Sequence, residues 1–230
     1  MFSCAFDIFL PARQLPTLSP LSGLATTEAL RQFLEPAVRN RLAMKWPNDV
    51  LWDQAKLSGI LVEATRASAA PSSSDHHVVI IGIGLNLRDA TTISQNTQRA
   101  IADWSSIAEH SQQASLARCS DIVAKVAQSL YLSLNHVTAQ GFADLPTRYA
   151  QVDALIGQQV HIIDNGQVLH TGIVTGINTS GQLLLRHPDG SERAVTVGEV
   201  SVRAVAQVHP VRCAEGDAFS APRLSRVRQD

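Results

Sequence analysis

The stretch that decides the fold of this chain is KWPNDVLW at residues 45–52, followed after three residues by KLSGILVE at residues 56–63. Strand-like apolar residues surround two lysines, an amide and a carboxylate that lie within twelve residues: Lys45, Asn48, Asp49 and Lys56. Unpaired charge is costly to bury, so this pattern predicts a charged partner for the segment. A pair of lysines with a carboxylate suits a nucleotide phosphate and its Mg²⁺.

Each of these residues, taken singly, also has a purely structural interpretation. The Trp-Pro-Asn-Asp run at residues 46–49 is typical of a tight turn, because proline fixes φ and Asn and Asp favour turn positions. A pair of lysines is commonly a solvated face. The combination of five consecutive residues, a fixed gap and a second motif of eight favours a functional site over a turn.

A second unusual segment is VVIIGIGLNL at residues 78–87. Side chains alternate between the two faces of a strand, so Gly82, Gly84 and Asn86 share one face and apolar residues share the other. Bare glycines weaken a strand but let a flat ring approach its backbone, and Gly59 repeats this feature in the neighbouring strand. A β-bulge or close packing against a helix explains the glycines equally well. Leu87 stands where a G-x-G-x-x-G fingerprint needs its third glycine, which argues against a Rossmann fold.

Composition is that of an ordinary globular protein. The chain has 230 residues, enough for one large domain or for a medium domain with a small appendage. The formal net charge of −1 implies no general affinity for nucleic acid or for an anionic membrane. The longest apolar run, at residues 78–87, is too short to cross a bilayer.

The cysteines and the N-terminus indicate a cytoplasmic location. Cys4, Cys119 and Cys213 are far apart in the sequence and form no C-x-x-C pair, which predicts reduced thiols and makes a zinc site improbable. The first residues, MFSCAFDIFLPARQ, have neither a basic leading region nor a small-residue cleavage site, so we expect no signal peptide.

Periodicity predicts a larger first domain over residues 1–152. Strands are expected at residues 2–10, 42–45, 50–52, 56–65 and 78–87, with a flexible connection at 66–77. A helix is expected from Ser19, as N-cap, to Pro36, and an amphipathic helix at 116–134, followed by a helical piece at 141–150. Residues 89–111 are expected to be irregular, with a short helix around Trp104.

A second, smaller domain is predicted at residues 153–206. Its apolar runs are short and are separated by the turn signals Asp164-Asn165-Gly166, Thr179-Ser180-Gly181 and Pro188-Asp189-Gly190. Five strands in about fifty residues indicate a small barrel, which we expect to be SH3-like. The polar, unpatterned stretch at residues 207–230 is expected to be disordered.

KWPNDVLW…KLSGILVE closely resembles the core signature of the biotin protein ligases, and the helix from Pro20, the GIGLN strand, the later helix and the small barrel follow in that family's order. The resemblance covers most of the chain. It implies an α/β fold, with a mixed-sheet biotin/lipoate ligase-like catalytic domain followed by the SH3-like barrel. In that family the enzyme activates biotin with MgATP to biotinyl-5′-AMP and transfers biotin to one lysine of a carboxylase carrier domain.

The resemblance also implies a role for each residue that matches the family's motifs. The catalytic residues it implies are Lys56, which contacts biotin and the reacting phosphate, and Lys45 in the nucleotide site. The biotin-binding residues it implies are Lys56, Gly59, Leu61, Gly82 and Gly84. The ATP-binding residues it implies are Lys45, Asn48, Asn86 and Arg203, with Asp49 as the carboxylate near Mg²⁺.

The expected activity is therefore that of a biotin–[acetyl-CoA-carboxylase] ligase that uses ATP, Mg²⁺ and biotin. The expected partner is the biotin carboxyl carrier domain of a carboxylase, with no nucleic acid, no membrane and a possible homodimer. The alternative from another class is a non-catalytic binding module that retains part of the ligase fold. A lipoate ligase is favoured less, because the KWPND and GILVE strings and the barrel favour biotin.

The sequence departs from the family's pattern upstream of its first strand. Members carry a serine-threonine segment and a glycine-arginine loop of the GRGRxGR type there, and Met1 begins where the family is already past that loop. We expect either a fragment or misassigned start of a longer ligase, or a short protein with impaired chemistry. A chain without this loop is expected to be a poor ligase, because a closing loop protects the reactive adenylate from water. The family's optional DNA-binding domain is also not seen, so a repressor role has no support.

Overall fold

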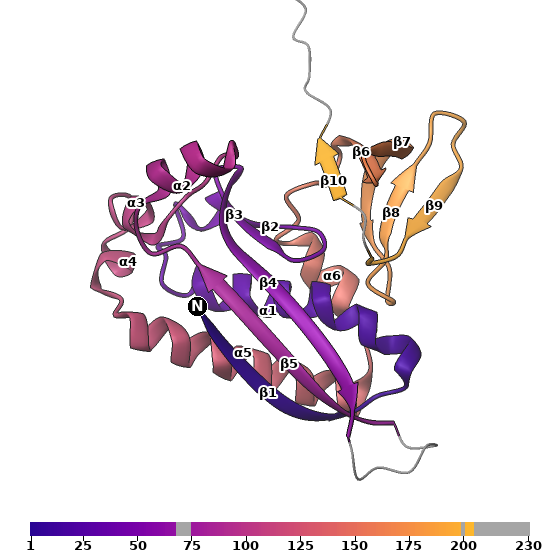
Figure 1. Ribbon diagram of the computed structural model, residues 1–230, viewed down its shortest axis with the longest axis horizontal. Coiled ribbons are helices and arrows are strands. Elements are labelled where there is room, and N and C mark those ends of the chain that lie inside the picture. The colour runs from indigo at the N-terminus through magenta and orange to yellow at the C-terminus, as the bar shows by residue number, and fades with distance from the viewer. Residues whose placement is uncertain (68–74, 199–200, 205–230) are drawn as a thin grey trace, which may run out of the picture.

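The structure is a computed structural model that describes residues 1–67, 75–198 and 201–204. It contains two five-stranded sheets, with α-helices packed behind the first (Figure 1). The large sheet has the strand order β1-β5-β4-β3-β2 and is formed by β1 (Phe2–Phe9), β2 (Leu42–Lys45), β3 (Asp49–Trp52), β4 (Ala55–Arg66) and β5 (His76–Leu85). The small sheet has the order β10-β6-β7-β8-β9 and is formed by β6 (Gln159–Asp164), β7 (Gln167–Ile177), β8 (Leu183–Arg186), β9 (Glu192–Val195) and β10 (Ser201–Ala204).

The strands named above pair antiparallel throughout, which corrects our expectation of a mixed large sheet. Strands β2, β3 and β4 follow one another in the chain through short reversals, and a reversal of that kind joins antiparallel neighbours. Among the described residues, parallel pairing occurs in two isolated bridges, between Met44 and Asp153 and between Lys56 and Ile101.

The helices of the described residues are α1 (Leu18–Arg31), α2 (Ala90–Thr97), α3 (Trp104–Ala108), α4 (Gln112–Leu116), α5 (Cys119–Gln140) and α6 (Leu145–Ala150), with 3₁₀ turns η1 (Ala12–Thr17) and η2 (Arg39–Arg41). Helices α1 and α5 lie across one face of the large sheet (Figure 1). Helix α1 is buried on nearly all sides because it packs against β2, β3 and β4 of that sheet and against α5 and α6. A Cβ atom at Gly23 would come within 2.2 Å of Met44 Cε, so the glycine allows α1 to approach β2 closely.

The opposite face of the large sheet carries no helix over its centre (Figure 1). Alternate residues of β1 show the two environments: Ser3, Ala5 and Asp7 are exposed, whereas Cys4 and Phe6 on the other face are partly buried. The same alternation runs along β5, where Val79, Ile81 and Ile83 are in the core. Alternation of this kind is expected for a sheet with one covered face.

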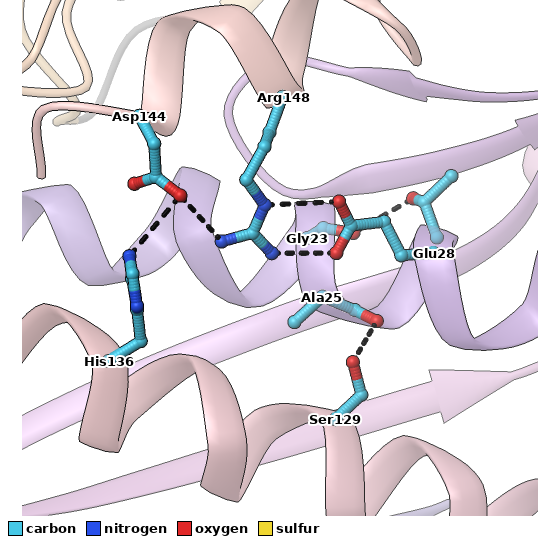
Figure 2. A network of polar contacts seen from close by, with 8 residues as sticks. Gly23, Ala25, Glu28, Ser129, His136, Asp144 and Arg148 are labelled. Atoms are coloured by element: carbon cyan, nitrogen blue, oxygen red, sulfur yellow. Dashed lines mark hydrogen bonds and ion pairs between the residues drawn. The ribbon is translucent and has the colours of Figure 1, made fainter.

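A polar network fixes α6 against α1 and α5, as Figure 2 shows. The Arg148 guanidinium donates to both carboxylate oxygens of Glu28, at 2.7 and 3.2 Å. Asp144 lies within 3.5 Å of the same guanidinium and within 3.3 Å of His136 Nε2. The bidentate hydrogen bond that Arg148 donates to Glu28 raises the pKa of Arg148 above its usual value. Because α6 leads into the small sheet, this network also fixes where that sheet begins.

The small sheet is docked on the large one through the β7–β8 turn. Trp46, which is 1% exposed, donates its indole N–H to the carbonyl oxygen of Gly181 at 2.9 Å. The Thr17 hydroxyl donates to the carbonyl oxygen of Ser180 at 2.9 Å. The turn backbone therefore contacts both the KWPND motif and the start of α1.

Most predicted strands are confirmed to within two residues, and the three predicted turns of the small sheet are confirmed as reversals between paired strands. The predicted N-cap is wrong, because α1 starts at Leu18 as a continuation of η1 and Ser19 lies inside its first turn. Helices α2 and α4 were not predicted, since both are short and lie in a polar stretch. The expected disordered stretch at 207–230 lies outside the described residues, as does the centre of the 66–77 connection. The domain boundary between residues 152 and 153 stays a prediction.

Candidate active site

Four residues of the predicted site form one row across the open face of the large sheet. Lys45 pairs with Asp49, Asp49 with Gly59, and Gly59 with Gly84. The row runs from β2 through β3 and β4 to β5 and is perpendicular to the strands, so neighbouring members are about 5 Å apart. The row therefore has two charged side chains at its β2 end and two glycines without side chains at its β5 end.

A β-bulge in the β3–β4 pairing places Lys56 on the same face of the sheet as this row. Strand pairing shifts between Val50 and Leu51, so that Ser58 pairs with Val50 but Lys56 pairs with Leu51. Without the shift, Lys56 and Gly59 would point to opposite faces, because their separation is an odd number of residues. Leu57 and Ser58 are consecutive buried residues at the bulge, which leaves Lys56 and Gly59 facing the open side together.

An ion pair joins Lys56 to Asp49 of this row. Lys56 Nζ lies 2.5 Å from Asp49 Oδ1, and both side chains are about one-third exposed or less. A Cβ atom at Gly59 would lie 3.1 Å from Lys56 Nζ and 3.6 Å from Asp49 Oδ1. The glycine therefore leaves the space over which the lysine side chain reaches its carboxylate.

A cleft of about 630 Å³ lies between this row and the small sheet. We call it the basic cleft. Its lining residues are Lys45, Trp46, Pro47, Asn48, Asp49, Leu51, Gln54, Lys56, Thr97, Gln98, Arg99, Ala100, Leu155, Gln158, Val202, Arg203 and Ala204. Its charged lining residues are four cations and the carboxylate of Asp49, which leaves a net of three positive charges. Such a cleft favours a polyanion.

Lys45, at the end of β2, is a partly buried cation of this cleft. Burial lowers the pKa of Lys45 below its usual value, and the nearby charges of Lys56, Arg99 and Arg203 lower it further, while Asp49 opposes them. The predicted residue Arg203, from the end of the small sheet, is thus close enough to act on a lysine of the large sheet. An anion bound here would relieve the repulsion among these cations.

A second hollow of about 610 Å³ lies beside the first, and we call it the glycine pocket. Its lining residues are Met1, Lys56, Gly59, Gly84, Leu85, Asn86, Ile93, Thr97, Arg99 and Ile101. A Cβ atom at Gly84 would meet only the carbonyl oxygen of Gly59, at 3.8 Å, so the backbone is accessible there. Lys56, Thr97 and Arg99 line both hollows and therefore lie at the border between them.

Leu61 and Gly82 lie next to Gly59 and Gly84 on the same face of the sheet, and we call these four residues of β4 and β5 the glycine strip. Leu61 and Gly82 pair with each other, and Ser3 of β1 pairs with Gly82. Leu61 is 61% exposed and lines a third hollow together with Pro47 and Asn48. The predicted biotin residues therefore lie on one continuous surface, although only Lys56, Gly59 and Gly84 line the glycine pocket itself.

The two predicted asparagines hold backbone groups in place. Asn48 Nδ2 donates to the carbonyl oxygen of Ile60 at 2.7 Å. Asn86 Nδ2 donates to the carbonyl oxygens of Lys56 and Ala102, at 3.2 and 3.1 Å. Asn86 lies with the glycines rather than with Lys45, Asn48 and Arg203, so the ATP residues implied by resemblance are divided between the two hollows.

Among the lining residues that were not predicted, Arg99 and Trp46 matter most for the charge and the packing of the site. Arg99 lies in a stretch expected to be irregular and carries no local pattern, so no signal in the sequence distinguishes it from a surface arginine. Trp46 was seen as part of a motif, but its hydrogen bond to a residue 135 positions away could not be anticipated.

The donor set fits a cation carried by a phosphate rather than one held by protein alone. The described residues contain no group of three or more His, Cys, Asp or Glu that could hold a metal ion. Mg²⁺ is commonly bound through one or two carboxylates together with substrate phosphates and water. Asp49, at the edge of the basic cleft, is suited to such a contact once its partner Lys56 turns to an anion.

Among the described residues, no helix is long and apolar enough to span a membrane.

Comparison with protein families gives two matches in this chain. Residues 1–86 match the Biotin/lipoate A/B protein ligase family, and residues 155–203 match the Biotin protein ligase C terminal domain. The first match contains every predicted site residue except Arg203, which is the last residue of the second.

Two curated proteins with similar sequences are ligases of the same kind by name. The chain is 31% identical over 175 residues to Biotin--[acetyl-CoA-carboxylase] ligase of Paracoccus denitrificans, over 76% of this chain and 68% of that protein. It is 28% identical over 187 residues to Bifunctional ligase/repressor BirA of Escherichia coli (strain K12), over 81% of this chain and 53% of that protein. The chain thus spans about two thirds of the first relative and about half of the second.

A solved structure has the same fold. Biotin protein ligase from Aquifex aeolicus in complex with biotin and ATP superposes with a TM-score of 0.65 at 23% identity, over 88% of this chain and 79% of that one. The expected fold class is therefore confirmed, with an α/β first domain and an SH3-like C-terminal domain, apart from the antiparallel pairing reported above.

Proposed function

Because this chain belongs to the biotin protein ligase family, we propose that it activates biotin with ATP and transfers the biotinyl group to a lysine of a carrier domain. One observation carries the proposal: Lys56 stands where the glycine pocket meets the basic cleft. A pocket with a glycine floor and a cationic cleft that share one lysine suit a ring-bearing carboxylate and a triphosphate that must react with each other.

In the first step, an oxygen of the biotin carboxylate attacks the α-phosphorus of ATP, the bond to the β-phosphate breaks, and pyrophosphate leaves. This step brings two anions together. Lys56 would hold the carboxylate and the α-phosphate, while Lys45 would stabilise the charge that develops on the phosphates. Cations fixed before the reaction lower the barrier because they need no reorganisation when the charge develops.

In the second step, the ε-amine of the carrier lysine attacks the carbonyl carbon of biotinyl-5′-AMP. The mixed anhydride bond breaks, AMP leaves, and an amide forms. No side-chain nucleophile of the enzyme is required, in agreement with the lining of the two hollows, whose polar side chains are cations, amides, a threonine and one carboxylate.

We assign the substrates to the two spaces as follows. Biotin lies on the strip formed by Gly59, Leu61, Gly82 and Gly84. The nucleotide reaches from Asn86 past Lys56 into the basic cleft, where Lys45, Asn48 and Arg203 meet its phosphates. Mg²⁺ bound to the phosphates would neutralise negative charge on the triphosphate, and Asp49 is the residue that would hold it.

The relative named Biotin--[acetyl-CoA-carboxylase] ligase supports the carrier domain of a carboxylase as the acceptor. A cytoplasmic location is part of the same proposal. Cys4 and Cys119 are free thiols in the described part of the chain, as is usual in a reducing compartment.

The test is biotin-dependent exchange of pyrophosphate into ATP by the purified chain, followed by transfer of labelled biotin to a purified carrier domain. Exchange that requires biotin, and label on the carrier, are the expected results. Nucleotide binding without any biotin-dependent exchange would favour the non-catalytic binding module instead. Exchange driven by lipoate and not by biotin would identify a lipoate ligase.

A further inference from the structure

The segment that follows α2 is fastened to the backbone of Lys56. Lys56 donates its backbone N–H to the carbonyl oxygen of Ala100 at 2.8 Å and accepts from the N–H of Ala102 at 3.0 Å. These two bonds form the isolated parallel bridge between Lys56 and Ile101. Asn86 donates to both strands of the bridge, through the carbonyl oxygens of Lys56 and Ala102. The segment is thus held at the head of β4, beside the lysine that borders both hollows.

Arg99 lies directly before this bridge and directly after the end of α2. The helix ends at Gln98, whose φ of +52° turns the chain out of the helix. The Ser94 hydroxyl donates to the carbonyl oxygen of Arg99 at 2.6 Å. The backbone of Arg99 is therefore held from both sides, although its side chain is exposed and lines both the basic cleft and the glycine pocket.

The charge of Arg99 has no carboxylate partner among the residues that the structure describes, whereas Lys56 is paired with Asp49. Its effect on Lys45 shows that it acts across the cleft: together with Lys56 and Arg203, Arg99 lowers the pKa of that lysine after burial has done so. Arg99 comes from the α2 side of the cleft and Arg203 from β10, and these two elements stand on either side of β2 and β3 (Figure 1).

We propose that Arg99 is a nucleotide-binding residue that contacts the β- and γ-phosphates of ATP and, with Arg203 on the other side, holds the triphosphate across the basic cleft. The proposal rests on the proposed function and deepens it. A guanidinium group offers planar paired donors that match two phosphate oxygens and stays charged at any physiological pH. The net of three positive charges in the cleft matches a triphosphate better than a monophosphate.

The experiment compares nucleotides of increasing phosphate number on four forms of the full 230-residue chain: wild type, Arg99→Ala, Arg99→Lys and Arg88→Ala. Arg88 is an exposed arginine of the same connection that is outside the lining of both hollows, so it controls for a general loss of positive charge. Calorimetric titration with ATP, ADP and AMP gives the dissociation constants. Thermal melting confirms that each variant is folded.

We expect Arg99→Ala to weaken ATP by at least about tenfold and AMP by less than about twofold, with ADP between them, because one charge-assisted contact is lost. Arg99→Lys should recover part of the loss, and Arg88→Ala should bind all three nucleotides as the wild type does. In biotin-dependent exchange, the KM for ATP should rise for Arg99→Ala while the KM for biotin stays constant.

An equal loss for ATP, ADP and AMP, or no loss for ATP, would overturn the role of Arg99. These outcomes are separate from the proposed function. If the wild type shows biotin-dependent exchange and Arg99→Ala leaves the ratio of the ATP and AMP dissociation constants unchanged, the ligase function stands and Arg99 does not bind the phosphates. ATP binding that depends on Arg99, without biotin-dependent exchange, supports Arg99 and removes the ligase function. A wild type that binds no ATP overturns both.

Discussion

The glycine strip and the basic cleft meet at Lys56 but are built in different ways. Two adjacent strands, β4 and β5, supply the whole strip, and its spacing follows from their pairing. The cleft takes its cations from β2, β4, the segment after α2 and β10, which belong to both sheets. The strip is therefore a local feature, whereas the cleft exists only when distant parts of the chain are packed together.

This difference makes the two halves of the site separable by mutation. A change at Gly59, Gly82 or Gly84 should alter biotin binding and leave the nucleotide alone. A change in the docking of the small sheet, through Trp46 and Gly181, should alter the nucleotide and leave biotin alone. Lys56, which belongs to both, is where a single change should affect the whole reaction.

Lys56→Ala should have the largest effect, because it removes a cation from the carboxylate and the phosphate at once. We expect adenylate formation to fall by on the order of 10²–10³, the cost of one preorganised contact in the transition state. Trapping biotinyl-5′-AMP with hydroxylamine measures that rate. The pair that Lys56 forms with Asp49 is partly exposed, so thermal stability should change little. Near-normal adenylate formation would contradict the assignment of Lys56.

Gly84→Val tests the strip alone. A β-branched side chain suits a strand, and a Cβ atom at this position would meet only the carbonyl oxygen of Gly59 at 3.8 Å, so the fold should tolerate it. The added volume would occupy the floor of the glycine pocket, and we expect biotin binding to weaken by at least about tenfold through steric exclusion. Calorimetry with biotin and, separately, with ATP measures the effect. Unchanged biotin affinity would mean that the glycines serve packing.

Gly181→Ala tests the cleft through domain docking. Gly181 has a φ of +70°, and a Cβ atom would come within 2.8 Å of Pro20 Cγ and 3.1 Å of Thr17 Cγ2. The turn should shift away from α1, and Arg203 should move with the small sheet. We expect ATP affinity to fall several-fold, about 1 kcal/mol, with biotin affinity unchanged.

Gly190→Ala is the matched control for that change. Gly190 also has a positive φ, of +83°, but a Cβ atom there would meet nothing within 4 Å. Both variants therefore carry a similar backbone strain, and only Gly181→Ala disturbs the contact between the sheets. Equal effects of the two variants on ATP binding would show that the docking contact does not position the cleft.

The distinction between local and assembled features also explains what the sequence could predict. The slot of Gly59, Gly82 and Gly84 was predictable, because alternation along strongly apolar strands places these glycines on one face of neighbouring strands. The pairing of Lys45 with Asp49 and of Asp49 with Gly59 was not predicted, since it depends on how the strands align. The bulge that places Lys56 on this face was not predicted either, since the pairing shift depends on the partner strand.

Arg99 shows the limit more clearly. Its position depends on hydrogen bonds between the backbone of Lys56 and residues more than forty positions later, which no pattern around Arg99 reveals. Helix α2 was missed for a related reason: its eight residues include no buried one, so no apolar periodicity marks it. Arg203 was predicted through resemblance, and only the docked small sheet explains why a residue so late in the chain belongs to the site.

Asp153, which forms a β-bridge with Met44 of β2, gives the smallest expected effect on ligand binding. Its neighbours tie the connection between the domains to β2, through Met44 N–H to Val152 O at 2.7 Å and Ala154 N–H to Met44 O at 2.8 Å. Burial raises the pKa of Asp153 to about 6, against hydrogen bonds from the backbone of Leu155 and Ile156. Its Oδ2 atom is buried and has no hydrogen-bond partner in the described residues.

The sign of the pH effect follows from that raised pKa. The folded state favours the protonated carboxyl, so the stability from Asp153 is fully present below pH 3.8 and is lost as pH rises toward about 6. Asp153→Asn keeps an acceptor for the Leu155 N–H and removes the charge, so it should stabilise the protein above pH 6, by up to about 3 kcal/mol. Thermal melts between pH 4 and pH 8 measure this, and ATP titration at pH 7 should show equal or tighter binding, with biotin unaffected.

Asp103→Asn is the contrasting variant. Hydrogen bonds from Ser105, Ser106 and Ala90 outweigh burial and lower the pKa of Asp103 to about 2, so that change should destabilise the protein at neutral pH. Parallel pH profiles for the wild type and Asp153→Asn would contradict this account of the junction.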